Sequence, residues 1–108
     1  MKYDVVIIGA GPAGIFTALE LVRNGSDKKI LMVEKGKPVD KRHCPKAETG
    51  KCMNCKPNCM ITTGFSGAGA FSDGKLSLSC EVGGELPNLI GSEFAQELSD
   101  YTDKIYLE

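Results

Sequence analysis

The feature that most constrains the fold is an apolar run that leads directly into a glycine motif. Val5 to Ile8 is an unbroken and mostly β-branched run, which is typical of a parallel strand buried on both faces. Gly9, Gly11 and Gly14 follow it at the spacing G-x-G-x-x-G. That spacing alone is weak evidence, but here a strand pattern precedes it and a helical pattern follows it. The sequence therefore predicts a strand, a tight turn and a helix that together bind a dinucleotide.

Each residue of the motif has a physical role in that prediction. Gly9 allows the tight turn, Gly11 lets a diphosphate approach the main chain, and Gly14 lets the helix pack close to the strand. Pro12 and Ala13 then open the helix, where the missing N–H of a proline costs nothing. The free N–H groups of this first turn and the positive end of the helix dipole form an anion site. The alternative is a glycine-rich turn in some other α/β protein.

A second strand completes a βαβ unit. The apolar stripe predicts a helix from Pro12 to Asn24, which Gly25 can end in the left-handed conformation. The apolar run from Ile30 to Val33 predicts the next strand. A right-handed crossover would place the two strands parallel and adjacent.

Glu34 stands at the end of that second strand, beside the expected phosphate-binding turn. A carboxylate at this place can accept both ribose hydroxyls of an adenosine, and it would repel a 2′-phosphate. The alternative is a glutamate that simply faces solvent.

The segment from Asp4 to Gly14, with Glu34 after it, resembles the FAD-binding start of two-dinucleotide-fold flavoproteins. The resemblance implies an α/β, Rossmann-like FAD/NAD(P)-binding fold with a parallel βαβ unit in residues 1–35. It implies that the glycine turn holds the ADP half of FAD and that Glu34 holds the ribose. The position near residue 4 and the Pro-Ala pair after Gly11 favour FAD over NAD. Lys35 and Arg42 are secondary candidates for contacts with the pyrophosphate or the adenosine.

A second informative stretch, residues 62–80, is rich in small residues. Glycine and serine in such number permit close approach of the backbone to a ligand, although they also form flexible linkers. Phe65 and Phe71 argue against a solvated linker. With the cysteines before it, the stretch resembles a group of bacterial FAD-dependent dehydrogenases whose chains are several times longer. The resemblance implies a loop along the flavin and its pyrophosphate, made by Ser66, Gly67, Ala68, Gly69, Ala70, Ser72 and Asp73.

Four of the five cysteines, Cys44, Cys52, Cys55 and Cys59, lie in an expected irregular loop over residues 43–60. Their sulfurs could complete a zinc site or hold an iron–sulfur cluster, and His43 could replace one ligand. The spacing matches neither a zinc ribbon nor the common ferredoxin runs. A redox dithiol and unliganded thiols therefore remain open, and nearby lysines would favour the thiolate in every case. Cys80 is expected to be a buried residue of a strand.

Composition excludes other classes of function. The net charge of −1 argues against non-specific nucleic-acid binding. No apolar segment reaches the length of a membrane span, so no membrane partner is expected. Five cysteines and no secretory signal indicate a reducing, cytoplasmic setting. No catalytic acid, base or nucleophile stands out, so catalytic residues, substrate and electron donor stay unassigned.

The remaining chain predicts little chemistry. Residues 87–91 are expected to form a loop, and Ser92 to cap a helix whose apolar stripe carries Phe94, Leu98 and Tyr101.

Residues 1–108 are expected to form a single, partial FAD-binding domain of a flavin-dependent oxidoreductase. We expect a truncated domain that alone is inactive and binds FAD weakly or not at all. The alternatives are a nucleotide-binding module with a cysteine-rich metal knuckle, and a fragment of a flavin dithiol reductase.

Overall fold

The computed structural model describes residues 1–108, which form two compact units, Met1–Ser72 and Asp73–Glu108. The first unit contains strand β1 (Val5–Ile8), helix α1 (Pro12–Arg23), strand β2 (Ile30–Val33), the 3₁₀ turn η1 (Val39–Lys41), the short helix α2 (Lys46–Thr49) and the 3₁₀ turn η2 (Gly67–Phe71). The second unit contains helices α3 (Leu86–Ile90) and α4 (Ser92–Leu107). None of these helices is both long and apolar enough to cross a membrane.

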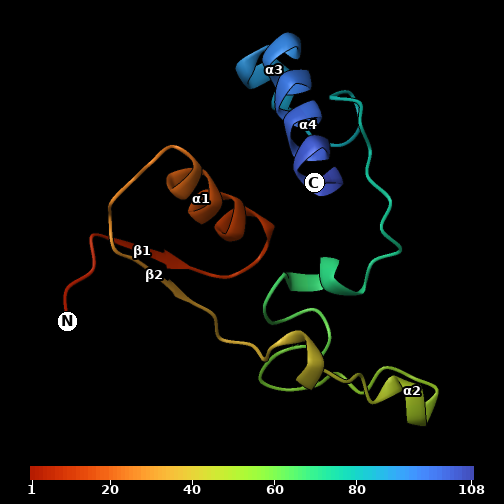
Figure 1. Ribbon diagram of the computed structural model, residues 1–108. Coiled ribbons are helices and arrows are strands. Elements are labelled where there is room, and N and C mark those ends of the chain that lie inside the picture. The colour runs from red at the N-terminus through yellow and green to blue at the C-terminus, as the bar shows by residue number, and fades with distance from the viewer. The chain divides into compact units, whose positions relative to one another are not determined.

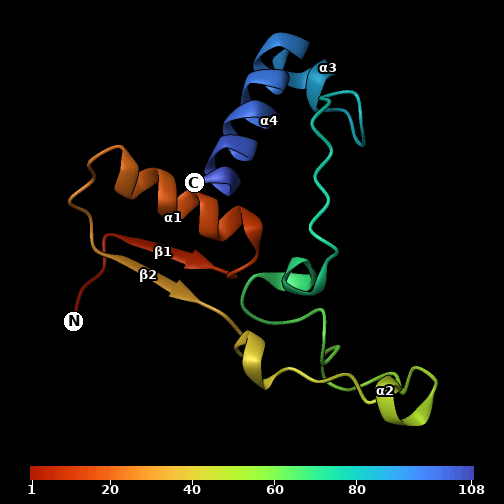
Figure 2. The ribbon, with the colours of Figure 1, turned by 45° about the vertical axis from the view of Figure 1, so that its right-hand side comes forward.

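The predicted βαβ unit is confirmed. β1 and β2 form a two-stranded parallel sheet, with α1 lying along it in both views (Figures 1 and 2). The register pairs Val5 with Ile30, Val6 with Leu31, Ile7 with Met32 and Ile8 with Val33. The predicted α/β, Rossmann-like fold class therefore holds.

α1 begins and ends close to where the sequence predicts. Pro12 occupies its first turn and Gly11 is its N-cap residue. Asn24 is the C-cap, and Gly25 follows in the left-handed conformation with φ +73°. The N–H of Gly25 donates to the carbonyl of Val22 at 3.0 Å and closes the last turn. The observed end differs from the predicted one by a single residue because Asn24 caps the helix instead of continuing it.

Burial of β1 differs from the prediction of a strand covered on both faces. Val5 and Ile7 are half-buried, whereas Val6 is 55% exposed and Ile8 is 88% exposed. The physical reason is that α1 covers one face of the two strands and no second layer of the first unit covers the other. The apolar run of β1 would allow burial on both faces. No element of the first unit packs on the face that carries Val6 and Ile8, so that face stays exposed.

The second unit differs from the prediction at two places. Residues 86–90 form α3 instead of a loop, because Pro87 fits the first turn of a helix. Gly91, with φ +88°, then ends α3 and serves as the N-cap of α4, so Ser92 is the first residue of α4 and not its cap. Cys80 lies in a turn and not in a strand, because its N–H donates to the side chain of Gln96 at 3.1 Å.

The segment from His43 to Met60 belongs to the first unit and extends away from the sheet, with α2 near its far end in both views (Figures 1 and 2). It was expected to be irregular throughout, and α2 is the exception. Gly50, with φ +75°, ends this helix and donates its N–H to the carbonyl of Lys46 at 2.9 Å. The helix is only four residues long because a left-handed glycine follows Thr49 directly.

Candidate functional site

The glycine turn connects β1 to α1 and is closed by two backbone contacts. The N–H of Gly9 donates to the carbonyl of Val33 at 2.7 Å, which ties the turn to the end of β2. The N–H of Ile15 donates to the carbonyl of Gly11 at 3.0 Å, which starts the hydrogen-bond ladder of α1. The N–H groups of the first turn have no intrahelical acceptor. They are available to an anion at the positive end of the helix dipole.

Two glycines of the turn have opposite surroundings. A Cβ added to Gly14 would lie 2.1 Å from the carbonyl oxygen of Gly9 and 3.2 Å from Cγ2 of Ile7. Gly14 therefore permits the close packing of α1 on β1. A Cβ added to Gly11 would meet no atom within 4 Å. The space beside Gly11 is thus free for a diphosphate, which makes the turn fit the group that the motif predicts.

Glu34 connects the end of β2 to the glycine turn. Its Oε2 accepts the backbone N–H of Ala10 at 2.8 Å, and its Oε1 accepts the N–H of Gly36 at 2.8 Å. The hydrogen bond from Ala10, the one from Gly36 and the charge of Lys35 all lower the pKa of the Glu34 carboxyl. The side chain is therefore charged at neutral pH and lies beside the turn, where the sequence predicts it.

A pH dependence follows from these two hydrogen bonds. Because the pKa of Glu34 is lower in the folded state, its contribution to stability is complete above the pKa of an unfolded glutamate, about 4.3. That contribution is lost as the pH falls through the lowered folded-state pKa. We expect Glu34→Gln to show a shallower loss of stability in acid than the wild type in urea denaturation at a series of pH values. The exposed Glu97→Gln should keep the wild-type slope, and parallel curves for all three proteins would contradict the expectation.

The small-residue stretch returns to the same turn. The N–H of Ser66 donates to the carbonyl of Ala10 at 2.7 Å, and Ser66 adopts the left-handed conformation with φ +69°. A Cβ added to Gly67 would lie 3.7 Å from Cδ of Pro12 and 3.9 Å from Cα of Gly11. The structure thus brings Ser66 and Gly67 next to the glycine turn, 50 or more residues away in the chain.

The chain just after Glu34 pairs with the start of this stretch. Lys37 and Gly64 form an isolated parallel bridge, and the N–H of Phe65 donates to the carbonyl of Lys37 at 3.3 Å. A Cβ on Gly36 would lie 2.4 Å from the backbone of Gly64. Neither Gly36 nor Lys37 stands in a motif that predicts a role for it. The signal was a glycine two residues after Glu34, which indicates close approach of another backbone.

Arg42 is the only buried charged residue, with 6% of its surface exposed. Its Nη1 donates to the carbonyls of Ile61 and Gly67, each at 2.9 Å, and its Nη2 donates to the carbonyl of Phe65 at 2.7 Å. The guanidinium carbon lies 4.8 Å from the centre of the Phe71 ring. The buried Arg42 side chain therefore binds the backbone of the small-residue stretch. Its predicted contact with the cofactor stays a prediction.

A small pocket of about 190 Å³ lies beside the residues that follow Glu34. Its lining includes Lys35, Lys37 and Cys59. A side-chain hydrogen bond with Thr62 and backbone hydrogen bonds with residues 61 and 62 lower the pKa of the Cys59 thiol. The predicted adenosine contact of Lys35 is compatible with this position but is not tested by it.

The cysteines are all free thiols. Cys44 and Cys55 are half-buried, whereas Cys52 and Cys59 are exposed. No group of three or more His, Cys, Asp or Glu side chains is arranged to hold a metal ion. The predicted zinc or iron–sulfur ligands therefore gain no support and stay a prediction.

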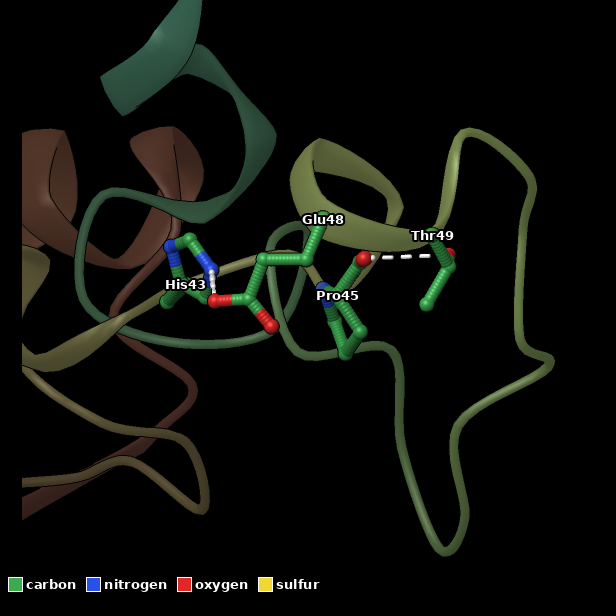
Figure 3. Close-up of polar contacts among 4 residues, drawn as sticks. All are labelled: His43, Pro45, Glu48 and Thr49. Atoms are coloured by element: carbon green, nitrogen blue, oxygen red, sulfur yellow. Dashed lines mark hydrogen bonds and ion pairs between the residues drawn. The ribbon is translucent and has the colours of Figure 1, made fainter.

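His43, the other candidate ligand, has a different contact. Its Nε2 lies 3.2 Å from Oε1 of Glu48 on α2, and both side chains are mostly exposed (Figure 3). The hydroxyl of Thr49 donates to the carbonyl of Pro45 at 3.0 Å in the same turn. An exposed pair of this kind adds little to stability. We therefore interpret the contact between His43 and Glu48 as a local contact of α2.

The other predicted flavin-side residues are divided between the two units. Ala68, Gly69 and Ala70 lie in η2, and Ser72 follows it at the end of the first unit. Asp73 begins the second unit, where its carboxylate lies 3.3 Å from the Lys75 ammonium. The contacts above thus join the glycine turn, Glu34, Ser66 and Gly67, and they do not include Asp73.

Comparison with known proteins places these features in a family. Residues 3–76 match the family described as pyridine nucleotide-disulphide oxidoreductase. The chain is 44% identical to an uncharacterized protein of Clostridium beijerinckii over 77 residues, 71% of this chain and 14% of that protein. It is 45% identical to the mitochondrial electron transfer flavoprotein-ubiquinone oxidoreductase of Dictyostelium discoideum over 42 residues, 35% of this chain and 7% of that protein. No solved structure matches. The matched part of the chain thus covers a small fraction of the length of either relative.

Proposed function

Because the chain belongs to the pyridine nucleotide-disulphide oxidoreductase family, we propose that it is the FAD-binding portion of a flavin-dependent oxidoreductase. The observation that carries the proposal is the hydrogen bonding of Ala10. Its N–H donates to Glu34 and its carbonyl accepts from Ser66. One residue of the phosphate-binding turn thereby joins the ribose-binding carboxylate to the small-residue stretch, as a site for an extended dinucleotide requires.

The diphosphate of FAD would lie at the N-terminus of α1. The open space beside Gly11 admits it, and the free N–H groups of the first turn, which include those of Ala13 and Gly14, are donors directed at an anion. Pro12 adds no donor but begins the helix without disturbing it. This part of the site needs no charged side chain, because the helix dipole and the backbone supply the positive potential.

The adenosine ribose would be held by Glu34. A carboxylate has about four lone-pair sites, so its two hydrogen bonds to backbone N–H groups leave acceptor positions for the ribose hydroxyls. Its lowered pKa keeps it charged. The charge repels a 2′-phosphate and favours a nucleotide with a free 2′-hydroxyl.

The flavin side is proposed with the remaining predicted residues. Ser66 to Ala70, with Ser72 and Asp73, would line the flavin and its pyrophosphate, and Lys35 is proposed as an additional contact. Bound FAD supplies hydride or electron transfer, while the protein binds and orients it. We propose that the reaction is a dehydrogenation. We propose the cytoplasm as its location, because five free cysteines suit a reducing compartment.

The proposal is tested with ADP, which needs only the glycine turn and Glu34. We expect the 108-residue chain to bind ADP saturably and to discriminate against its 2′-phosphorylated form by about tenfold or more, because Glu34 repels the added phosphate. Glu34→Gln should weaken ADP binding and reduce that discrimination, as followed by isothermal titration calorimetry. Glu97→Gln, which removes an exposed carboxylate of α4, is the matched control.

Two results would overturn the proposal. One is the absence of ADP binding by the folded protein, since weak or absent FAD binding by this chain alone is already expected. The other is equal affinity for ADP and its 2′-phosphorylated form in both the wild type and Glu34→Gln. Elemental analysis of the same sample separates the alternative, because zinc or iron without bound flavin would favour a nucleotide-binding module with a metal knuckle at the cysteines.

A further inference from the structure

We infer that Arg42 is a positioning residue of the cofactor site, which holds the Ile61–Gly67 segment against the glycine turn without itself touching the cofactor. The inference rests on the proposed function and adds the means by which two distant segments of the site stay together. Sequence patterns alone assign Arg42 to the pyrophosphate or adenosine, because a basic residue soon after a ribose-binding carboxylate suits an anion. The contacts of its guanidinium group support a different role.

The two terminal nitrogens of Arg42 are directed at the protein itself, whereas its buried Nε makes no hydrogen bond. Nη1 and Nη2 donate to three carbonyls, those of Ile61, Phe65 and Gly67, at 2.7 to 2.9 Å. Charge-assisted hydrogen bonds of this length are stronger than neutral ones. With 6% exposure, Arg42 presents almost no surface to a ligand. A cation in this position serves to gather backbone carbonyls that would otherwise be buried without a partner.

The surroundings of the side chain are shaped for it. The Phe71 ring lies 4.8 Å from the guanidinium carbon, so the cation is also placed by an aromatic face. Gly64 leaves room for the aliphatic stem, since a Cβ there would lie 2.7 Å from Cδ of Arg42. A lysine would keep the charge but could not place planar donors on three carbonyls at once.

The held segment reaches the cofactor site through its last residues. Ser66 and Gly67 follow directly on Phe65, and the carbonyl of Gly67 is itself an acceptor of Arg42. The Ser66 N–H donates to the carbonyl of Ala10, the residue that also binds Glu34. Ser66 is in the left-handed conformation, which is unfavourable for serine and must be held by its neighbours. Arg42 supplies that restraint by binding the carbonyls of Phe65 and Gly67, the residues on either side of Ser66.

The test uses amide hydrogen exchange of the free 108-residue chain and its affinity for FAD. Arg42→Lys and Arg42→Met should both accelerate exchange of the Ser66 N–H by about tenfold or more, while the Ile15 N–H in α1 keeps its wild-type rate. Both variants should weaken FAD binding to a similar extent, again by about tenfold. Each lacks the planar guanidinium group that binds three carbonyls, and this loss should matter more than whether the positive charge is kept. Lys41→Met, which removes the neighbouring exposed charge, should leave exchange and affinity unchanged.

Several results would overturn the inference. If Arg42→Lys keeps wild-type exchange and affinity while Arg42→Met loses affinity, the charge alone matters and Arg42 contacts the cofactor directly. Equal acceleration at Ser66 and Ile15 would show general destabilisation instead of local release. If Arg42→Met does not fold, Arg42→Lys is measured alone, because it keeps the charge and the aliphatic stem but loses the planar set of donors. Unchanged Ser66 exchange in that variant would refute the role. A wild type that binds neither ADP nor FAD refutes the proposed function alone, because the exchange rates still decide the role of Arg42.

Discussion

Replacing Gly14 by alanine is expected to lower the free energy of unfolding by about 3 kcal/mol, at the upper end of the cost of overpacking. The added Cβ would lie 2.1 Å from the carbonyl oxygen of Gly9, and that oxygen is backbone that cannot rotate away. α1 would have to move off β1, which removes the covering of the one half-buried face of the sheet. Urea denaturation followed by far-UV circular dichroism measures the effect.

Gly69→Ala is the matched control for this substitution. Gly69 lies in η2 without a positive φ, and a Cβ there would meet no atom within 4 Å. Its replacement should leave the free energy of unfolding within about 0.5 kcal/mol of the wild type. Equal denaturation midpoints for Gly14→Ala and the wild type would show that α1 does not depend on close contact with the strand.

Gly11→Val should have the opposite effect, with a loss of ADP and FAD binding by about 30-fold or more but little loss of stability. Gly11 has an extended conformation with φ −79° that valine can adopt, and a Cβ meets no protein atom. The cost to the fold is about 1 kcal/mol or less, from the loss of a favourable N-cap residue. The new methyl groups would occupy the space that a diphosphate needs.

Calorimetric titration and urea denaturation of the same Gly11→Val sample check this prediction. Gly14→Ala serves as the contrast in the denaturation measurement, because it should lower the free energy of unfolding whereas Gly11→Val should not. Wild-type affinity in Gly11→Val would mean that the diphosphate does not lie at this turn. Two glycines three residues apart would thus separate packing of the fold from binding of the nucleotide.

The parts of the fold that could be predicted from the sequence depend on local signals. Val5–Ile8 and Ile30–Val33 have the predicted boundaries, because apolar runs bounded by glycine and charge leave little choice of register. The end of α1 was predicted within one residue from Asn24 and Gly25. The parallel pairing followed from the handedness of the crossover.

The parts that could not be predicted depend on long-range contacts or on competing local signals. Arg42 acquires its acceptors from residues 19 to 25 positions later in the chain, which no local pattern reveals. Pro87 is compatible with a loop and with the first turn of a helix, and the structure has the helix. Cys80 follows an alternating Leu-Ser pattern typical of a strand, but no neighbouring strand is present in its unit to pair with it.

The hydrogen bond between Arg42 and Ile61 also bears on how this chain can change through evolution. This bond joins the two residues that flank the segment from His43 to Met60, so it closes the segment as a loop. Each doubling of such a loop costs only about 0.6 kcal/mol in closure entropy. We therefore expect insertions or deletions in the segment to cost little stability and to leave the glycine turn and Glu34 in place.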